Sequence, residues 1–346
     1  MKSNRTERDP VAEAAISRGG MLLIGFLFIF FTQIIYIVLS SGLQDFLAST
    51  GEALDAWRDL LYALASVACL PFIAVVKHFF MPSEGSTPKT EITKQLGIFS
   101  ISKKDGANQL KHALLMWLIV FVPLDLISYL IPGMLEFQTR SLTIPPSGLY
   151  FTVTMFSLFL GLSLLVHFFV ATQEELMYRG VLQFQGQEKV GLNSAIVISA
   201  LFFGLSHFSY WFNDTTQPIY FPIWWAASGV FFGLMLALYF RTTGRILPMI
   251  LAHWWNNVVS TIAIRTYLST TDAVSTMTFL GWVLYLPLIF CGIVLAIFWR
   301  RTIGKAAKLV KKEVKSYLKQ PRYEIFLDIV FGLGLWMVLL LMSGGL

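Results

Sequence analysis

Residues 149–180 read LYFTVTMFSLFLGLSLLVHFFVATQEELMYRG, a long run of apolar side chains that ends in a cluster of charges. The part from 149 to 171 contains no Asp, Glu, Lys or Arg. About 20 consecutive apolar residues allow an α-helix to cross the hydrocarbon core of a bilayer. The stretch therefore predicts a membrane-spanning helix that leads into charged residues.

Similar apolar runs occur along the rest of the chain. Of its 346 residues, 56% are hydrophobic and 13% are charged, and the mean hydropathy is +0.67. Soluble domains are about 45–50% apolar and about a quarter charged. We therefore expect an all-α fold, a polytopic transmembrane helical bundle of about eight to nine spans. The runs that predict these spans are residues 20–41, 60–80, 112–132, 149–171, 194–212, 220–240, 246–264, 278–299 and 325–343.

The distribution of basic residues predicts an orientation for this bundle. With a cytoplasmic N-terminus, 23 of the 26 Lys and Arg residues fall in cytoplasmic segments, and only Arg58, Arg140 and Arg265 lie outside. Cytoplasmic loops of membrane proteins carry such an excess. The net charge of +6 would then face anionic lipid headgroups, so we expect membrane lipids and no nucleic acid as partners.

The polarity of the segments divides the chain into three parts. Residues 1–148 hold three spans and a cytoplasmic loop at roughly 81–111, residues 149–265 form a core with polar side chains in its spans, and residues 266–346 hold two apolar spans. The linker at 300–324 has apolar residues at helical spacing among six lysines. It is either an amphipathic helix at the membrane interface or a solvated segment whose charges set the topology.

The charges after the fourth span form the first candidate motif. Glu175 and Arg179 are four residues apart, so on a helix they can pair, while Glu174 points about 100° away and is free to face another group. The Glu175 carboxylate would be neutralised by Arg179, and the neighbouring Glu174 carboxylate would be available. This arrangement suits the positioning of a reactive base. The alternative is that all three charges mark the cytoplasmic end of the helix.

Two further spans carry polar pairs at helical spacing. Phe203 and His207 share one face of the fifth span, and Gly204 lets another helix approach closely. His253 and Asn257 share a face of the seventh span and offer hydrogen-bond donors that can stabilise an oxyanion. The structural alternatives are a buried, hydrogen-bonded histidine and polar contacts that hold helices together.

Together these residues resemble a known set of motifs. The set is Glu174-Glu175-x-x-x-Arg179, Phe203-x-x-x-His207 and His253-x-x-x-Asn257. It resembles the three ordered motifs of the CAAX-protease and bacteriocin-processing (CPBP) family of intramembrane endopeptidases. The resemblance covers roughly residues 150–265. It implies a helical fold around a polar intramembrane cavity open towards the cytosol, and a membrane-anchored protein or peptide substrate, with or without a lipid.

The resemblance also implies a role for each motif residue. Glu174 is the expected general base, His207 holds and polarises the attacking water, and His253 with Asn257 forms the oxyanion hole. Glu175, Arg179 and Phe203 support these groups, with Arg179 able to reach a substrate carboxylate. No cofactor is expected from this mechanism.

Other functions remain open at this point. Zinc hydrolysis could use Glu174, His207 and His253 as ligands, although a His-Glu-x-x-His motif is absent. A non-enzymatic scaffold, a regulator or a bacteriocin-immunity protein could retain the same polar core. A transporter would show two matching halves with broken helices, which this sequence lacks.

The depths of the motif residues raise one structural question. Glu174 falls near the cytoplasmic end of the fourth predicted span, whereas His207 lies about 20 Å into the fifth, at about 1.5 Å per residue. For the two to meet, either the fourth span continues further or the fifth begins nearer residue 200. In the first case residues 181–192 are helical and partly immersed.

Overall fold

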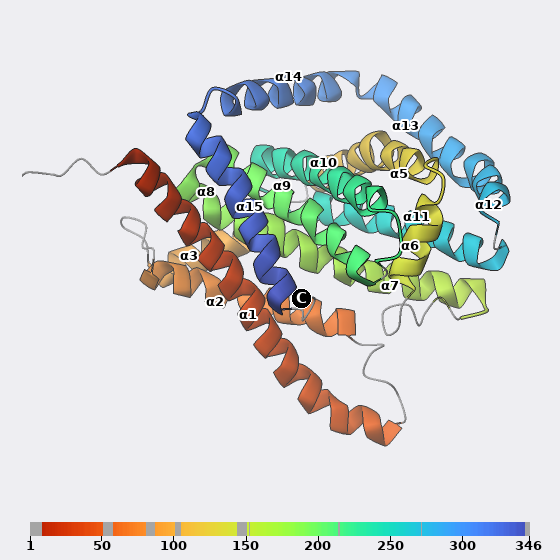
Figure 1. Cartoon of the computed structure of the whole chain (residues 1–346), viewed down its shortest axis with the longest axis horizontal. Helices are drawn as coiled ribbons and strands as arrows, with labels where there is room; N and C mark the ends of the chain where they lie inside the picture. The colour runs from red at the N-terminus through yellow and green to blue at the C-terminus, as the bar shows by residue number, and fades with distance from the viewer. Residues whose placement is uncertain are drawn as a thin grey trace, which may run out of the picture.

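The computed structural model describes residues 9–50, 58–80, 87–100, 105–143, 151, 153–213, 215–270 and 272–342. Within these ranges every regular element is helical, which confirms the all-α prediction (Figure 1). Short 3₁₀ and π-helical stretches, labelled η, interrupt or join the α-helices. The bounds are α1 Pro10–Thr50, α2 Arg58–Phe80, α3 Pro88–Leu96, η2 Gly97–Phe99, α4 Gly106–Met116, η3 Trp117–Phe121, α5 Val122–Tyr129, α6 Met134–Leu142, α7 Phe156–Glu175, η5 Leu176–Gln183, α8 Phe184–Val190, α9 Leu192–Phe208, η6 Ser209–Asn213, α10 Tyr220–Thr243, α11 Leu247–Thr270, α12 Ala273–Leu280, η7 Gly281–Tyr285, α13 Leu286–Phe298, α14 Arg300–Tyr317 and α15 Arg322–Met342.

Eight helical segments in the described part of the chain are long and apolar enough to cross a membrane. They match eight of the nine predicted spans. The ninth, predicted at 246–264, is α11, which has 24 residues but is not among the eight. Its polar side chains, including His253, Asn256 and Asn257, lower its hydropathy. The chain is therefore an integral, multi-pass membrane protein.

The fourth span is much longer than its apolar run. Residues Phe156–Val190 form one segment of 35 residues, in which α7 continues through the π-helical η5 into α8. Glu174 thus lies near the middle of this continuous helix, and of the two alternatives left open by the sequence, the one in which the fourth span continues further applies. The helix continues because the polar groups that follow are buried: Arg179 donates to the Gly233 carbonyl (3.1 Å) and Gln183 to the Ala237 carbonyl (2.8 Å) of α10.

Backbone carbonyls of η5 accept hydrogen bonds from neighbouring helices. π-Helical turns disturb the regular backbone ladder and often occur at functional sites. Here the Tyr178 carbonyl accepts a hydrogen bond from the Ser199 hydroxyl (2.7 Å), and the Gly180 carbonyl accepts one from the Gln95 amide (2.7 Å). Side chains from α9 and α3 thereby hold the segment that directly follows Glu174 and Glu175.

Helices α9 and α10 approach each other closely where both carry glycine. A Cβ at Gly204 would lie 2.4 Å from the Val230 backbone nitrogen, and one at Gly229 would lie 2.9 Å from the Gly204 Cα. Only hydrogen fits at these positions, as is common where membrane helices pack through small residues. The contact brings α10 against the His207 ring, whose Nδ1 is 3.4 Å from the same Gly229 Cβ position.

The segment predicted as a cytoplasmic loop is partly helical. Residues 88–96 form α3, which Pro88 and a capping box between Thr87 and Thr90 begin. Helix α4 then starts at Gly106 instead of near residue 112. Residues 81–86 and 101–104 of the predicted loop lie outside the described residues.

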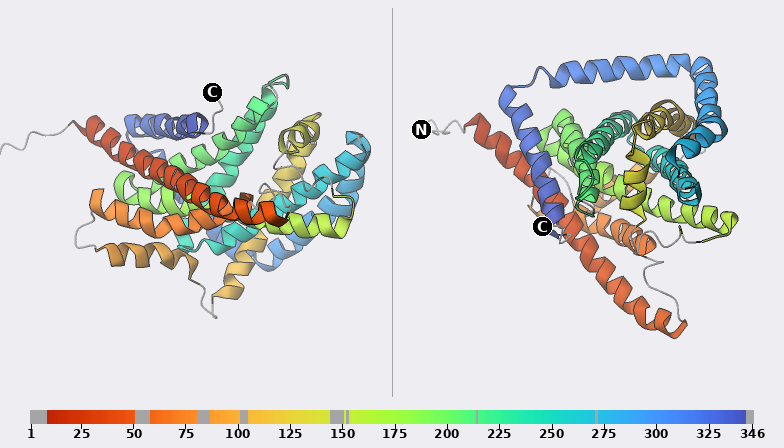
Figure 2. Two further views of the ribbon diagram at one scale, coloured as in Figure 1. Left: turned by 90° about the horizontal axis from the view of Figure 1, so that it is seen from below. Right: turned by 45° about the vertical axis from the view of Figure 1, so that its right-hand side comes forward.

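The basic linker is also helical. Helix α14 crosses one edge of the bundle and joins α13 to α15 (Figures 1 and 2). An ion pair between Glu313 and Arg241 ties it to α10, and the Asn193 amide donates to the Ser316 hydroxyl (3.1 Å). This helix favours the amphipathic alternative over a solvated linker.

Candidate active site

A polar cavity of about 140 Å³ lies between α5, α6, α7, α9, α10 and α11. Five of the seven predicted site residues line it, namely Glu174, Phe203, His207, His253 and Asn257. The other two, Glu175 and Arg179, are fully buried and lie behind this lining. The fold thus brings together three motifs that are up to 83 residues apart in the sequence.

One oxygen of the Glu175 carboxylate contacts two other buried side chains. Its Oε1 accepts a hydrogen bond from Arg179 Nη1 (3.2 Å) and lies 2.9 Å from His253 Nδ1. Because a carboxylate oxygen accepts, His253 Nδ1 must donate, which orients the ring and leaves Nε2 facing the cavity. Glu175 and Arg179 therefore pair, as their spacing predicted, and the pair also positions His253.

Glu174 has a different environment from its neighbour. Its side chain is 29% exposed, whereas that of Glu175 is 0% exposed. The Glu174 Oε2 lies 3.4 Å from His253 Nε2 and has no hydrogen-bond partner among the described residues, although the atom is buried. The cavity therefore holds one carboxylate whose hydrogen-bonding capacity is not used by the protein.

His207 is held by its own helix. Its Nδ1 lies 2.9 Å from the Phe203 carbonyl, so Nδ1 donates and Nε2 carries the lone pair of the neutral ring. The ring of Phe203 separates the two histidines, with centroids 5.0 Å from His207 and 5.6 Å from His253. The Arg179 guanidinium lies 4.7 Å from the same ring, so Phe203 is packed by three functional side chains.

Asn257 lies one helical turn beyond His253 and lines the same cavity. Its neighbour Asn256 also lines the cavity, and the Asn256 Oδ1 is buried without a hydrogen-bond partner among the described residues. Sequence reasoning singled out Asn257 alone because it considered the i, i+4 partner of His253. The cavity has amide groups from both residues.

Asp125 is a buried carboxylate that the sequence analysis missed. It lines the cavity from α5 and accepts hydrogen bonds from the Ser260 hydroxyl (3.1 and 3.0 Å to its two oxygens) and the Tyr285 hydroxyl (2.8 Å). The signal was available, because an aspartate inside the predicted span 112–132 is costly unless it is paired or functional.

His167 was missed for a similar reason. It lies in the predicted span 149–171, seven residues before Glu174, so both residues occupy one face of the helix. Its Nε2 lies 2.5 Å from the Thr261 hydroxyl, which in turn donates to the Asn257 carbonyl (2.7 Å). The spacing to Glu174 would have identified it.

The cavity has a polar end and an apolar end. From Glu174 and His253 its polar lining continues to His167 on α7 and Thr261 on α11. Further in the same direction, Arg265 on α11 donates to the Phe151 and Thr154 carbonyls, which precede α7. In the opposite direction, towards the end of the bundle that carries α14, the lining is apolar, with Phe121, Phe232 and Leu236.

The arrangement of His, Cys, Asp and Glu side chains bears on whether the site could hold zinc. Among them, no group of three His, Cys, Asp or Glu side chains is arranged to hold a metal ion. The ligand set considered for zinc, Glu174, His207 and His253, has one histidine nitrogen engaged by Glu175 and another by the Phe203 carbonyl. Metal binding there would use the two Nε2 atoms and the Glu174 carboxylate.

The fold and this cavity define a multi-pass helical membrane protein with a polar cavity between its helices. Residues 156–259 match the model of a family described as type II CAAX prenyl endopeptidase Rce1-like. The match confirms the resemblance to the CPBP family, and the matched residues contain all seven predicted site residues. The match supports a peptidase domain in this part of the chain. No curated protein and no solved structure matched the chain.

Proposed function

We propose that this protein is a glutamate-dependent intramembrane endopeptidase that hydrolyses a peptide bond with a water activated by Glu174. The observation that supports it best is the contrast between two adjacent carboxylates. Glu175 is fully buried and contacts Arg179 and His253 through Oε1, whereas Glu174 is 29% exposed and lines the cavity. A general base needs a carboxylate that is not already neutralised.

In this proposal Glu174 and His207 share the attacking water. The water donates one hydrogen bond to Glu174 and the other to the Nε2 of His207, which carries a lone pair when Nδ1 donates to the Phe203 carbonyl. As the water oxygen bonds to the scissile carbonyl carbon, its proton moves to Glu174. The protonated Glu174 then gives this proton to the leaving amine when the C–N bond breaks.

The carbonyl oxygen that becomes negative during this step needs donors. His253 and the Asn257 amide are our candidates, since both line the cavity one helical turn apart. His253 Nδ1 contacts Glu175, so in this role the ring must carry a proton on both nitrogens. A protonated His253 presents Nε2–H to the oxyanion. Donors held rigidly in a site with little water stabilise such charge strongly.

The substrate class follows from where the site lies. Glu174 lies on a helical segment that is long and apolar enough to cross a membrane, so a scissile bond must reach a cavity between such helices. We therefore propose a membrane-anchored protein or peptide as the substrate. The family description names a prenyl endopeptidase, which makes a prenylated carboxyl-terminal peptide the first substrate to test.

We also propose a cytoplasmic N-terminus, on the strength of the bias in basic residues. The polar end of the cavity then faces away from the cytosol, because it lies beside Arg265. The opening towards the cytosol implied by the family resemblance stays a prediction, and this lining weighs against it. Labelling Gln138→Cys, in a variant without Cys69 and Cys291, with an impermeant thiol reagent from one side distinguishes the two openings.

A scaffold or immunity protein is the second candidate. It would need the helices and their contacts but not an unengaged carboxylate. A bound partner without cleavage, unaffected by Glu174→Gln, would support this alternative.

The deciding experiment measures cleavage of membrane-anchored peptides, prenylated and not, by purified protein. Wild type is compared with Glu174→Gln, with and without a chelator. Cleavage that resists the chelator and is lost in the variant supports the glutamate mechanism. Chelator-sensitive cleavage that added zinc restores assigns the site to a metal, and a fully active Glu174→Gln rejects both mechanisms.

A further inference from the structure

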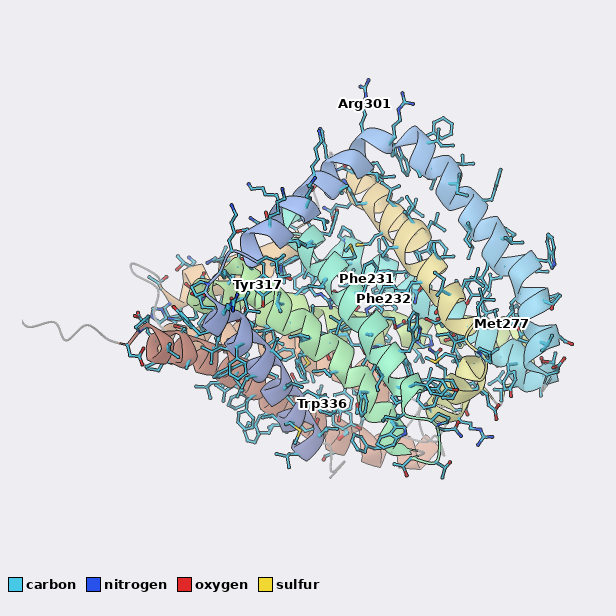
Figure 3. All side chains as sticks on the ribbon, turned by 45° about the horizontal axis from the view of Figure 1, so that its top comes forward. Phe231, Phe232, Met277, Arg301, Tyr317 and Trp336 are labelled. Atoms are coloured by element: carbon cyan, nitrogen blue, oxygen red, sulfur yellow. The ribbon has the colours of Figure 1, made fainter. Side chains whose placement is uncertain are left out.

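A second and larger cavity of about 540 Å³ lies between α4 with η3, α10 and α14. We call it the α14 groove. It shares no lining residue with the polar cavity. In Figure 3 its outer wall, α14, runs along one edge of the molecule between Arg301 and Tyr317. The α14 groove therefore lies where the helical bundle meets the basic helix α14.

The α14 groove is polar at one end and apolar along its length. On α4 the lining residues progress from Asn108, Lys111 and His112 in the first two turns to Leu115 and Met116 deeper in the helix. Helix α10 runs in the opposite direction and has the same gradient. Its lining changes from Thr242 and Tyr239 near the carboxyl end to Leu238 and Met235 further inside. Both gradients match the headgroup-to-chain direction of a lipid.

The polar end of the groove carries positive charge. Lys111 and Lys305 line it, and no Asp or Glu is among the lining residues. Neither lysine forms an ion pair in the described part of the chain, whereas the nearby Arg241 is paired with Glu313 and Arg245 with Asp105. Two unpaired ammonium groups at the mouth of an apolar groove favour an anionic group there.

We propose that the α14 groove binds an anionic phospholipid, with its phosphate between Lys111 and Lys305 and an acyl chain along α4 and α10. Basic pockets between transmembrane helices on the cytoplasmic side commonly bind such headgroups. The outward lysines of α14, such as Lys312 and Lys319, line a separate surface and attract the bulk leaflet less specifically. The lipid would fasten the first half of α14 to the bundle. The proposal does not depend on peptidase activity.

The test measures lipid binding by native mass spectrometry of the full chain in detergent. Phosphatidylglycerol is titrated against phosphatidylcholine with the same acyl chains. We expect the wild-type protein to bind phosphatidylglycerol at one site more tightly than it binds phosphatidylcholine. The double variant Lys111→Gln, Lys305→Gln should bind it about thirtyfold more weakly, since each lysine near an anionic surface contributes about fivefold.

The matched control is Lys312→Gln, Lys319→Gln, which removes the same charge from the outer face of α14. It should retain the wild-type affinity, whereas an equal loss in both double variants would reduce the effect to general surface charge and overturn the proposal.

Ala306→Trp, which fills the groove and keeps both lysines, should also abolish the site. Binding of phosphatidylcholine as tight as that of phosphatidylglycerol would overturn the proposal. Preferential binding of a geranylgeranylated peptide, insensitive to the two lysines, would assign the groove to a substrate anchor instead.

Discussion

Among the residues that the structure describes, two arginines are buried, and their surroundings differ in an instructive way. Arg18 on α1 donates to Asp328 on α15 (2.7 Å), to the Ser194 hydroxyl on α9 (3.1 Å) and to two backbone carbonyls. Arg179 on η5 donates to Glu175 (3.2 Å) and to the Gly233 carbonyl (3.1 Å). Both side chains are almost fully buried, at 2% and 0% exposure. Burial of a charge therefore does not identify an active site.

The difference lies in what surrounds each pair. Neither Arg18 nor Asp328 lines the polar cavity or the α14 groove. The pair joins helices from the two ends of the chain, since α1 and α15 lie side by side (Figures 1 and 2). The Arg179 pair instead touches His253, next to a cavity and a second carboxylate, Glu174. The cavity and the partly exposed Glu174 distinguish the site that we propose as reactive.

The largest expected effect is a loss of cleavage activity on changing Glu174, next to the Arg179 pair. Glu174→Gln keeps the shape of the side chain but removes the base, so we expect cleavage to fall by about 10²–10⁴-fold. The thermal unfolding temperature should stay at the wild-type value, because Glu174 makes no hydrogen bond that holds the helices together. Glu175→Gln is the matched variant and should lower this temperature, since it breaks the contact with Arg179. If the two variants changed activity and stability equally, the proposed difference in role between Glu174 and Glu175 would be wrong.

The Arg18 site should show the reverse pattern. Asp328→Ala removes the closer and fully buried of the two carboxylates that pair with Arg18, and leaves Glu324 at 3.5 Å. Breaking a buried pair costs about 3–5 kcal/mol. We expect a large loss of stability and of protein in the membrane fraction. The cleavage rate per folded molecule should remain that of the wild type. A folded variant with a lower rate would show that the α1–α15 contact acts on the site.

Loss of one oxyanion donor should come next. Asn257→Ala removes the amide that we place at the developing negative charge, so kcat should fall by about 10²–10³-fold with little change in KM. The variant Asn256→Ala changes the neighbouring amide and serves as the comparison. If Asn256→Ala has the larger effect on kcat, the assignment of the oxyanion hole to Asn257 is wrong.

The smallest effect is expected at the edge of the Arg18 site. Ser194→Ala removes one of several hydrogen bonds to this guanidinium, so the free energy of unfolding should fall by about 0.5–1.5 kcal/mol. Chemical unfolding in mild detergent measures the change. Double-mutant analysis with Asp328→Ala should give a coupling energy above zero, since both residues contact the same side chain. Simple additivity would show that the hydrogen bond contributes nothing to the pair.

The sequence predicted much of the fold and most of the candidate site because both rest on local patterns. Long apolar runs predicted the spans, and spacings of four residues predicted the shared faces of Phe203 with His207 and His253 with Asn257. The sequence left open whether the fourth span continues beyond its apolar run. Its polar continuation through η5 is stable only because Arg179 and Gln183 find carbonyl partners on α10, a contact between distant segments.

By itself, the sequence determined the helical class, the membrane spans and the set of chemical groups available for a peptidase site. These follow from composition and from the 3.6-residue period, which are local properties. Tertiary structure alone decided that Glu175 contacts His253 while Glu174 remains unengaged, that Asp125 and His167 join the cavity, and that α14 covers a groove beside two lysines. These facts depend on which helices become neighbours. That choice is made by packing between residues far apart in the chain.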